Sequence, residues 1–380
     1  MAEQTIVVLG GGVGGVVAAN ELHSRLKEKA RIVLIERSLR QSFAPSYLWV
    51  MTGDRTPKAI TRDITRLQRK GIEVVAGEVQ RIDLAQRAVA VDGREISYDY
   101  LIVALGAELA PDALPGLADA HTYYSLAGAE RLHDALATFE GGRIVLAVAG
   151  LPYKCPAAPY EGAMLLESYF HSHHRRHQME LAVYTPEPQP MPVGGPVLGE
   201  AIQELLAHKG IAFHPRKQLA AVEGAELRFE DGSSAAFDLL VAVPPHRPPP
   251  VVRDAGLSDD SGWVPVDQYT LETKHEGVFA IGDVTRIALT DGMFLPKAGV
   301  FAHSQAEVAA RNIAARILGS AKRERFDGRG YCFLEVGGGS AGMAQGNFFG
   351  HPRHIAMRSP SPVWHWGKVA LERYWLWKWY

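Results

Sequence analysis

The apolar residues near the start of the chain fall into three segments with different spacing. Residues 5–9 and 31–36 each contain a short continuous apolar run, and residues 13–28 between them repeat apolar positions at helical spacing. Short apolar runs bounded by glycine predict buried parallel strands, and the middle segment predicts the helix of a βαβ unit. Buried strands are also predicted at 100–106, 143–148 and 277–283, as in an α/β protein with Rossmann-like sheets.

The composition is that of a folded protein with an ordinary core. The chain has 380 residues, 40 Lys and Arg against 42 Asp and Glu, and 47% apolar residues. At about 100–200 residues per domain, this length predicts two or three domains. A charge this close to neutral, without long basic runs, excludes nucleic acid as a partner. The first residues do not form a signal peptide and no apolar window is long enough to span a bilayer, so we expect the chain to stay in the cytoplasm.

A glycine-rich turn joins the first predicted strand to the first predicted helix. Gly10, Gly12 and Gly15 fit the spacing G-x-G-x-x-G, and Glu36 ends the next strand 21 residues after Gly15. These glycines let the backbone approach a pyrophosphate at the helix N-terminus, while the carboxylate accepts a hydrogen bond from a ribose hydroxyl. A glycine-rich turn without a ligand is the alternative. The strand–turn–helix context favours a dinucleotide, either FAD or NAD.

Two later segments favour FAD. Tyr100–Gly106 is a predicted strand ending in a tight glycine turn, and Gly277–Asp283 is another, with a carboxylate just past the strand end. Both segments follow the glycine fingerprint in this order along the chain. With this order, the chain resembles the two-dinucleotide-fold flavoprotein disulfide reductase superfamily from end to end. The resemblance implies an FAD-binding domain at 1–107 and 251–319, a second Rossmann-like domain at 108–250 and a C-terminal region at 320–380.

The same resemblance implies which residues contact a non-covalent FAD. Gly10, Gly12, Gly15 and Glu36 would hold the diphosphate and the adenosine ribose. Lys297 and the helix end that follows it would stabilise negative charge on the reduced flavin, unless Lys297 is an ordinary lysine before a helix. The further contacts implied by the resemblance are Val79 at the adenine, Gly106, Asp283 on the ribityl side and Gly299 near the pyrimidine ring.

The second predicted Rossmann-like domain lacks a glycine fingerprint. Its strand Arg143–Val148 is followed by Pro152, the bulky pair Tyr153–Lys154 and Pro156. Prolines and large side chains replace the glycines that would let backbone amides reach a pyrophosphate. We therefore expect that NAD(P)H does not bind there.

The two cysteines, Cys155 and Cys332, are too few for a secreted disulfide scaffold. Inert buried thiols are the alternative, but the loss of the NAD fingerprint around Cys155 favours a chemical role. Cys155, Glu161 and the segment Gly330–Phe333 resemble the sulfide:quinone oxidoreductases and the flavoprotein subunit of sulfide-oxidising flavocytochromes. That resemblance implies sulfide as the donor and a Cys155–Cys332 redox disulfide, with Cys332 facing the flavin. Glu161 is then a candidate acid/base for the proton steps, or a carboxylate in a helix first turn.

Five of the seven tryptophans lie between Trp364 and Trp379. Trp and Tyr mixed with Lys and Arg on a short helix suit the headgroup layer of a membrane. We expect a peripheral membrane protein, attached on the cytoplasmic side, whose flavin reduces a membrane quinone. A helix docked on its own core or on a dimer partner is the alternative. The candidate quinone and membrane residues are Phe301, Phe333, Trp375 and Trp377.

Three other functions are alternatives at the level of the sequence. A flavocytochrome subunit would pass electrons to cytochrome c, but Ser42–Ser46 lacks the cysteine that tethers the flavin in that family. An NADH:quinone reductase would need the missing second fingerprint, and a non-catalytic redox sensor would turn over slowly with any donor. A homo-oligomer is open as well. Four histidines between His171 and His177 are predicted to lie on a helix, where a solvated basic face is favoured over a metal site.

Overall fold

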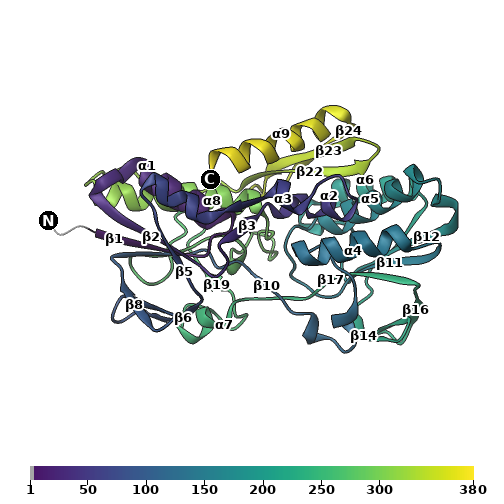
Figure 1. Cartoon of the computed structure of the whole chain (residues 1–380), viewed down its shortest axis with the longest axis horizontal. Coiled ribbons are helices and arrows are strands. Elements are labelled where there is room, and N and C mark those ends of the chain that lie inside the picture. Colours follow the sequence, from purple (N-terminus) through teal and green to yellow (C-terminus); the bar gives the residue numbers. More distant parts are fainter. Residues whose placement is uncertain (1–3) are drawn as a thin grey trace.

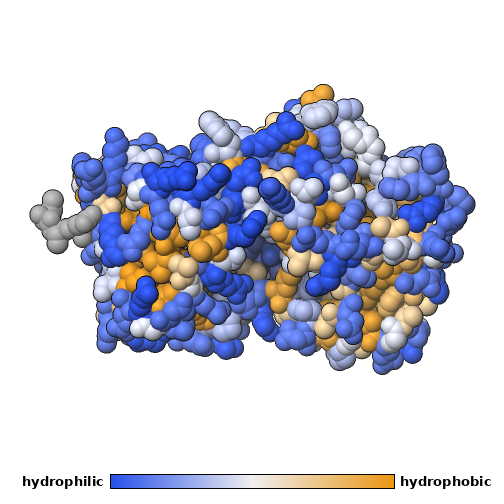
Figure 2. All heavy atoms as spheres, viewed as in Figure 1, coloured by the Kyte–Doolittle hydropathy of each residue, from blue (hydrophilic) through white to orange (hydrophobic). Residues whose placement is uncertain are grey.

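The computed structural model describes residues 4–380 as two parallel sheets with helices packed against them and a smaller C-terminal sheet covered by a long helix (Figure 1). Between the two halves, the surface is hollowed in the same view (Figure 2). The predicted α/β class, with two Rossmann-like units and a C-terminal region that ends in an aromatic helix, is confirmed.

The first sheet has five parallel strands in the order β20-β9-β1-β2-β5. Alternate residues of β1 face two different cores: Ile6 and Val8 pack toward α1, while Val7 and Leu9 pack toward an antiparallel sheet of β6, β7 and β8. This arrangement buries the strands on both faces, as their continuous apolar runs predict. The elements are β1 Gln4–Leu9, α1 Val13–Leu26, β2 Ala30–Glu36, β5 Glu73–Ala76, β6 Val79–Asp83, β7 Ala88–Val91, β8 Arg94–Ser97, β9 Tyr100–Val103, β20 Val278–Ala280 and α8 Gly299–Ile317.

The second sheet has four parallel strands in the order β13-β12-β11-β17, with a three-stranded antiparallel sheet beside it. The central strand β11 is the strand predicted at 143–148. Its elements are α4 Leu126–Thr138, β11 Gly142–Val148, α5 Ala158–Ser172, β12 Met179–Tyr184, α6 Pro196–His208, β13 Ile211–His214, β14 Leu219–Glu223, β15 Glu226–Phe229, β16 Ser234–Ala236 and β17 Leu239–Val243.

The C-terminal sheet consists of three antiparallel strands, and helix α9 packs across them. These elements are β22 Arg329–Gly337, β23 Ser340–Asn347, β24 Ile355–Ser361 and α9 Pro362–Lys378. Short elements complete the chain: β3 Arg40–Ser42, α2 Tyr47–Met51, α3 Pro57–Ile60, β4 Thr61–Asp63, β10 Glu108–Leu109, β18 His246–Arg247, α7 Pro250–Asp254, β19 Val264–Pro265 and β21 Thr285–Arg286.

The prediction that the histidines between 171 and 177 share a helix is wrong. Helix α5 ends at Ser172, and His174 has a left-handed backbone with φ 58°. The Nδ1 atom of His173 lies 2.7 Å from the carbonyl oxygen of Tyr169, so this ring folds back onto the last turn of the helix. The helical face that would have grouped these side chains does not form.

Candidate active site

The glycine turn after β1 is shaped by close backbone contacts. Gly10 has φ +97°, and a Cβ on Gly15 would lie 1.8 Å from the carbonyl oxygen of Gly10. At Gly12 the added Cβ would meet nothing within 4 Å. Gly10 and Gly15 therefore allow the turn to form, whereas Gly12 faces open space at the N-terminus of α1, where an anionic ligand group is favoured.

The carboxylate of Glu36 lies against this turn. It accepts hydrogen bonds from the backbone N–H of Gly11 at 2.6 Å and of Ser38 at 2.8 Å. The acid at the end of β2 is thus held beside the open side of the turn, where the fingerprint predicts a ribose contact. That contact stays a prediction.

Gly12→Ala is expected to weaken flavin binding by about tenfold or more while the protein still folds. Its Cβ has room in the chain itself, and alanine as a helix N-cap costs about 1 kcal/mol or less. A cofactor phosphate close to the backbone would lose that room. Flavin titration of the deflavinated protein measures the effect, with Gly350→Ala as the control because its Cβ would meet nothing closer than 3.4 Å. Equal flavin affinities in the two variants would contradict a phosphate at Gly12.

Past the end of β20, Asp283 is partly buried and has one buried carboxyl oxygen that is an unused acceptor. Its Oδ1 atom has no hydrogen-bond partner among the described residues. Burial raises the pKa of Asp283, although the nearby ammonium groups of Lys154 and Lys297 act in the opposite direction. An orphaned buried oxygen at the carboxyl end of a parallel sheet fits a ligand hydroxyl, as a ribityl chain would supply.

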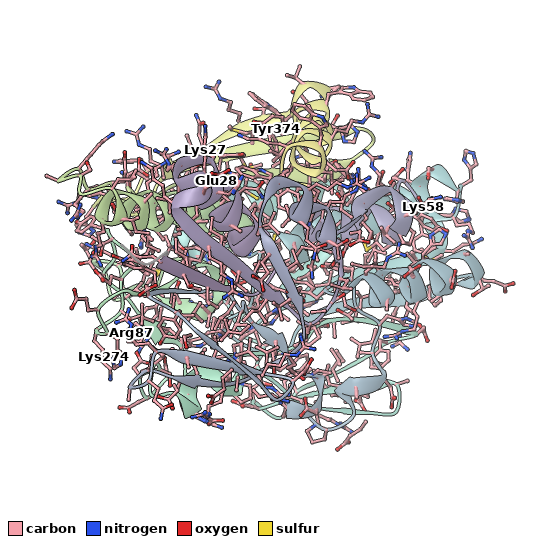
Figure 3. All side chains as sticks on the ribbon, turned by 60° about the vertical axis from the view of Figure 1, so that its left-hand side comes forward. Lys27, Glu28, Lys58, Arg87, Lys274 and Tyr374 are labelled. Atoms are coloured by element: carbon pink, nitrogen blue, oxygen red, sulfur yellow. The ribbon has the colours of Figure 1, made fainter. Side chains whose placement is uncertain are left out.

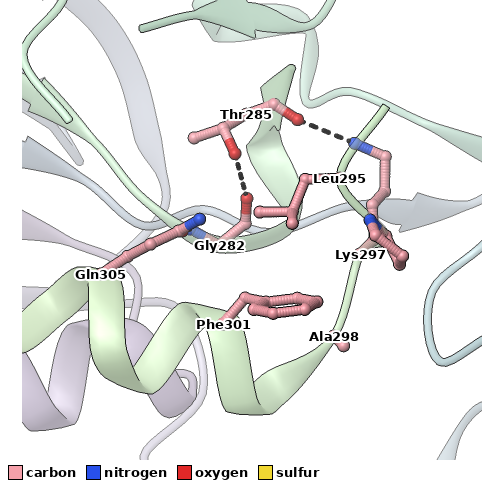
Figure 4. Close-up of a pocket in the computed structure, with 8 residues that line it drawn as sticks. Gly282, Thr285, Leu295, Lys297, Ala298, Phe301 and Gln305 are labelled. Carbon is pink, nitrogen blue, oxygen red and sulfur yellow. Dashed lines mark hydrogen bonds between the residues drawn. The ribbon is translucent and has the colours of Figure 1, made fainter. Parts of the chain in front are cut away.

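Lys297 lies beside Asp283 and is buried. Its Nζ atom donates to the carbonyl oxygens of Asp283 at 2.7 Å and Thr285 at 3.1 Å, and it sits 3.4 Å from the centre of the Trp263 ring. Burial lowers the pKa of Lys297 to about 8, so the ammonium is charged at neutral pH but held in a poorly solvated place. Figure 4 shows the pocket around it, which is lined by Gly282, Thr285, Leu295, Pro296, Lys297, Ala298, Phe301 and Gln305.

Cys155 and Cys332 come from different halves of the chain and lie close enough to interact electrostatically. Cys155 has a left-handed backbone, with φ 56°, and its N–H donates to the carbonyl oxygen of Lys297 at 2.7 Å. Cys332 lies on β22, and both residues are free thiols in this structure. Burial and the Glu161 carboxylate raise the pKa of Cys155 to about 12 and that of Cys332 well above its ordinary value. Both thiols therefore stay protonated at neutral pH.

Glu161 forms a buried ion pair beside the cysteines. Its Oε1 atom accepts from the Nζ atom of Lys368 at 2.7 Å and from the backbone N–H of Glu335 at 2.9 Å. The side chains of Glu161 and Lys368 are only 3% and 7% exposed. Burial lowers the pKa of Lys368, but the carboxylates of Glu161 and Glu335 outweigh it and raise that pKa above its ordinary value. Glu161 lies in the first turn of α5, but its carboxylate pairs with a cation on α9 and does not cap the end of its own helix.

The carboxyl end of the second sheet is filled by the chain itself. Glu187 follows β12, and its Oε2 atom accepts from the hydroxyls of Tyr153 at 2.8 Å and Tyr160 at 2.7 Å. Glu187 is 4% exposed, and burial raises its pKa. An acid after the second strand of a Rossmann unit is the usual ribose partner. Here it is occupied by Tyr153, from the segment after β11 that lacks a glycine fingerprint, and by Tyr160, from the first turn of α5.

Helix α9 presents aromatic side chains on two faces. Trp375 and Trp379 are 5% and 4% exposed, and the Trp375 ring lies 5.1 Å from that of Phe43. Trp366 and Trp377 are 63% and 77% exposed. Tyr374 also lies on the outer side of the helix (Figure 3).

One of the predicted quinone and membrane residues, Trp375, is therefore corrected. Trp375 belongs to the docked face of α9, because it fills a gap against the core. Phe301 is 4% exposed, contacts the rings of Phe326 and Phe348 and lines the pocket around Lys297, and its contact with a quinone stays a prediction. Phe333 is partly buried on β22, and its ring is 3.2 Å from where a Cβ on Gly367 of α9 would lie.

The remaining predicted cofactor residues lie around the first sheet. Val79 begins β6 and is half-buried, and Gly106 follows β9 with φ +70° and open space at its Cβ position. Gly299 is the first residue of α8. The structure places these residues, and their contacts with a cofactor stay predictions.

Two Rossmann-like units in one chain, with Cys155 in the segment after β11, Cys332 on β22 of the C-terminal sheet and the buried Lys297 just before α8, define a two-domain dinucleotide-dependent oxidoreductase. The pyridine nucleotide-disulphide oxidoreductase family matches residues 4–306, and the chain belongs to this family. It is a flavin-dependent oxidoreductase enzyme.

Among the relatives that resemble the chain over most of its length are a sulfide:quinone oxidoreductase and a sulfide-quinone reductase. The mitochondrial sulfide:quinone oxidoreductase of Mus musculus is 25% identical over 368 residues, covering 91% of this chain and 79% of the relative. The sulfide-quinone reductase of Aquifex aeolicus is 24% identical over 394 residues, covering 98% and 90%. The crystal structure of the sulfide:quinone oxidoreductase from Aquifex aeolicus superposes with a TM-score of 0.90 at 23% identity, covering 99% of this chain and 91% of that one. The resemblance predicted from the motifs is confirmed.

Along residues 4–380, none of the helices combines the length and the apolar character needed to cross a bilayer.

Proposed function

We propose that the protein oxidises sulfide with a non-covalent FAD and passes the electrons to a membrane quinone. The observation that carries the proposal is the meeting of Cys155, Cys332 and the Glu161–Lys368 ion pair in one buried place between α5, β22 and α9. The named relatives are sulfide:quinone oxidoreductases, which supports sulfide and quinone as the two substrates.

The residues present fit FAD. Gly12 leaves open space at the N-terminus of α1, Glu36 lies beside it, and Asp283 has an unused oxygen where a ribityl hydroxyl would be held. When bound, FAD supplies the two-electron acceptor of the reaction. Lys297, charged and fixed by two carbonyl oxygens, would favour negative charge in its vicinity.

In the proposed reaction, hydrosulfide attacks the sulfur of Cys155 in a Cys155–Cys332 disulfide. A new S–S bond forms, the bond between the cysteines breaks, and Cys332 leaves as a thiolate. Burial and the Glu161 carboxylate hold the pKa of Cys332 well above its ordinary value, and the ammonium of Lys368 acts in the opposite direction by stabilising the thiolate. A second hydrosulfide then takes the outer sulfur from Cys155. When the disulfide closes again, two HS⁻ have become one HSS⁻, with one proton and two electrons released.

Glu161 is placed to handle that proton. Its carboxylate bonds with Lys368 and acts electrostatically on both cysteines. A carboxylate that is hydrogen-bonded to a lysine ammonium can exchange a proton with it and so pass a proton toward or away from a reacting sulfur. The function of Glu161 as an acid/base is therefore favoured over that of a helix first-turn carboxylate.

The exposed face of α9 supports attachment to a membrane surface. Val363, Trp366, Tyr374 and Trp377 are 68%, 63%, 48% and 77% exposed. Their spacing of three, eight and three residues keeps them on one side of the helix, and aromatic side chains are favoured in the headgroup layer. This outer stripe lies next to the docked face that carries Lys368, which brings the buried site close to a bilayer and its quinone.

Replacing Trp366 and Trp377 together by serine is expected to lower binding to phosphatidylcholine–phosphatidylglycerol vesicles by about tenfold or more, because both rings are solvent-exposed and their apolar area is lost from the interface. Vesicle co-sedimentation measures the effect. The control carries Val197→Ser and Leu318→Ser, at positions 76% and 47% exposed on other helices or their ends. Equal loss in both double variants would contradict attachment through α9.

The experiment that tests the proposed function compares two donors without oxygen. Na₂S is added to one sample of the yellow holoprotein and NADH to another, and the visible absorbance of the flavin is followed. Rapid bleaching by sulfide and none by NADH is expected, because Tyr153 and Tyr160 occupy the acid of the second Rossmann unit. Bleaching by NADH alone would replace the proposal by an NADH:quinone reductase, and bleaching by neither would overturn both.

A further inference from the structure

A second ion pair extends the Glu161–Lys368 pair toward the surface. Glu335 lies on β22, three residues after Cys332, and its side chain is 1% exposed. Its carboxylate oxygens lie 3.2 and 3.0 Å from the Nδ1 atom of His365. His365 is on α9, one turn before Lys368, and its side chain is 22% exposed.

We propose that His365 and Glu335 carry protons between the solvent and the buried Glu161–Lys368 pair beside the two cysteines. The inference deepens the proposed function and rests on it for the reaction that the protons serve. His365 and Glu335 are not proposed to touch substrate or flavin; they act through Glu161 and Lys368.

The contacts give the route in three steps. The His365 side chain is 22% exposed to solvent, and its Nδ1 atom lies 3.0 Å from a carboxylate oxygen of Glu335. Glu335 and Lys368 interact electrostatically, and Lys368 donates to Glu161 at 2.7 Å. The backbone N–H of Glu335 also donates to Glu161, which holds the two acids next to each other. Imidazole can accept a proton on one nitrogen while it gives one up from the other.

Burial and neighbouring side chains act on this cluster of Glu161, Glu335, His365 and Lys368. Burial raises the pKa of Glu335, which brings its protonation closer to neutral pH. From β22 the Cys332 thiol faces the cluster, and from α2 the ring of Trp49 lies 5.9 Å from the His365 ring and 5.1 Å from the Lys368 nitrogen. The other face of this region carries Arg55, whose guanidinium lies 4.7 Å from the Trp49 ring and pairs with Glu372 at 2.9 Å.

The chemistry needs such a route because the thiols are partly buried and hold their protons. The proposed reaction releases one proton for each HSS⁻ formed, and the high pKa of both cysteines keeps protons on sulfur until another group removes them. Glu161 is 3% exposed and has no direct path to water through its own side chain. His365 is the member of the cluster with the largest exposed fraction.

The test uses an oxidant that accepts electrons without protons. The holoprotein is reduced with dithionite, desalted without oxygen and mixed with ferricyanide in weak buffer containing a pH indicator. Flavin absorbance reports oxidation and the indicator reports proton release. In the unmodified protein the two are expected to coincide. In His365→Ala proton release is expected to lag by about tenfold or more, and added imidazole is expected to remove the lag.

Two variants separate a proton route from a structural contact. Glu335→Gln is expected to show the same lag without rescue, because imidazole from solvent does not replace an interior carboxyl. His354→Ala, at an exposed histidine before β24, is the matched control and is expected to release protons together with oxidation. Coincident release in both His365→Ala and Glu335→Gln would overturn the inference, as would a lag in His365→Ala that imidazole leaves unchanged.

The same samples separate this inference from the proposed function. The ferricyanide measurement needs neither sulfide nor quinone. It therefore tests the proton route even if Na₂S fails to bleach the flavin. Bleaching by sulfide together with coincident proton release in both variants would keep the proposed function and remove the proton route.

Discussion

Replacing Cys332 by serine is expected to slow the reduction of the flavin by sulfide at least about a thousandfold. The serine oxygen cannot form the disulfide that hydrosulfide attacks, and it is not a redox partner for Cys155. Anaerobic stopped-flow mixing with Na₂S, followed at the visible flavin band, measures the rate. The same variant should still be bleached by dithionite, because Cys332 is not part of the glycine turn or of the Asp283 and Lys297 sites.

The neighbouring residue on β22 gives a matched control. Tyr331 is 41% exposed, and Tyr331→Phe keeps the ring while it removes only a hydroxyl. This variant should react with sulfide at the unmodified rate. If Cys332→Ser reacts as fast as Tyr331→Phe, the disulfide mechanism is wrong and sulfide must reduce the flavin directly.

The parts of the fold that depend on short-range pattern could be predicted from the sequence. The apolar runs of β1 and β2, with the glycine turn between them, specify a βαβ unit through contacts within 36 residues. The segment after β11 could be predicted to lack a nucleotide site for the same reason, since the missing glycines are local. The structure adds that Glu187 is occupied by Tyr153 and Tyr160, which only the folded chain brings together.

The ion pairs around the cysteines could not be predicted because their partners are far apart in sequence. Glu161 and Lys368 are separated by 207 residues, and Glu161 and Glu335 by 174. In the sequence, Lys368 is one of several cations in an aromatic tail, and that composition suits a membrane interface. The structure shows instead that it is buried, because β22 and α5 supply carboxylates that compensate its charge.

The rotation of α9 about its own axis determines which of its aromatic residues face the core. Tryptophans occur on both sides of the helix, so composition alone did not separate Trp375 from Trp377. The spacing of Lys368, Glu372 and Trp375 marks the docked face, and the polar members of that stripe find partners: Glu372 accepts from Arg55 at 2.9 Å and from the hydroxyl of Ser46. A search for apolar residues at helical spacing does not find a buried helix face that includes charged residues.

Lys368→Met is expected to lower the free energy of unfolding by about 3–5 kcal/mol, because it leaves the buried carboxylate of Glu161 without its cation. Lys378→Met, at an exposed lysine of the same helix, is the matched control and should change stability by less than about 0.5 kcal/mol. Urea unfolding of the holoproteins, followed by tryptophan fluorescence, measures both.

The double variant Glu161→Gln with Lys368→Met tests whether the stability lost in Lys368→Met comes from the unpaired carboxylate of Glu161. Removing the carboxylate charge as well leaves no uncompensated ion, so the double variant should be more stable than Lys368→Met alone by about 1–3 kcal/mol. A double variant that loses the sum of the two single effects would mean that the two residues act independently. The 2.7 Å contact would then contribute packing alone, and the lysine could not serve as the charged link between Glu335 and Glu161.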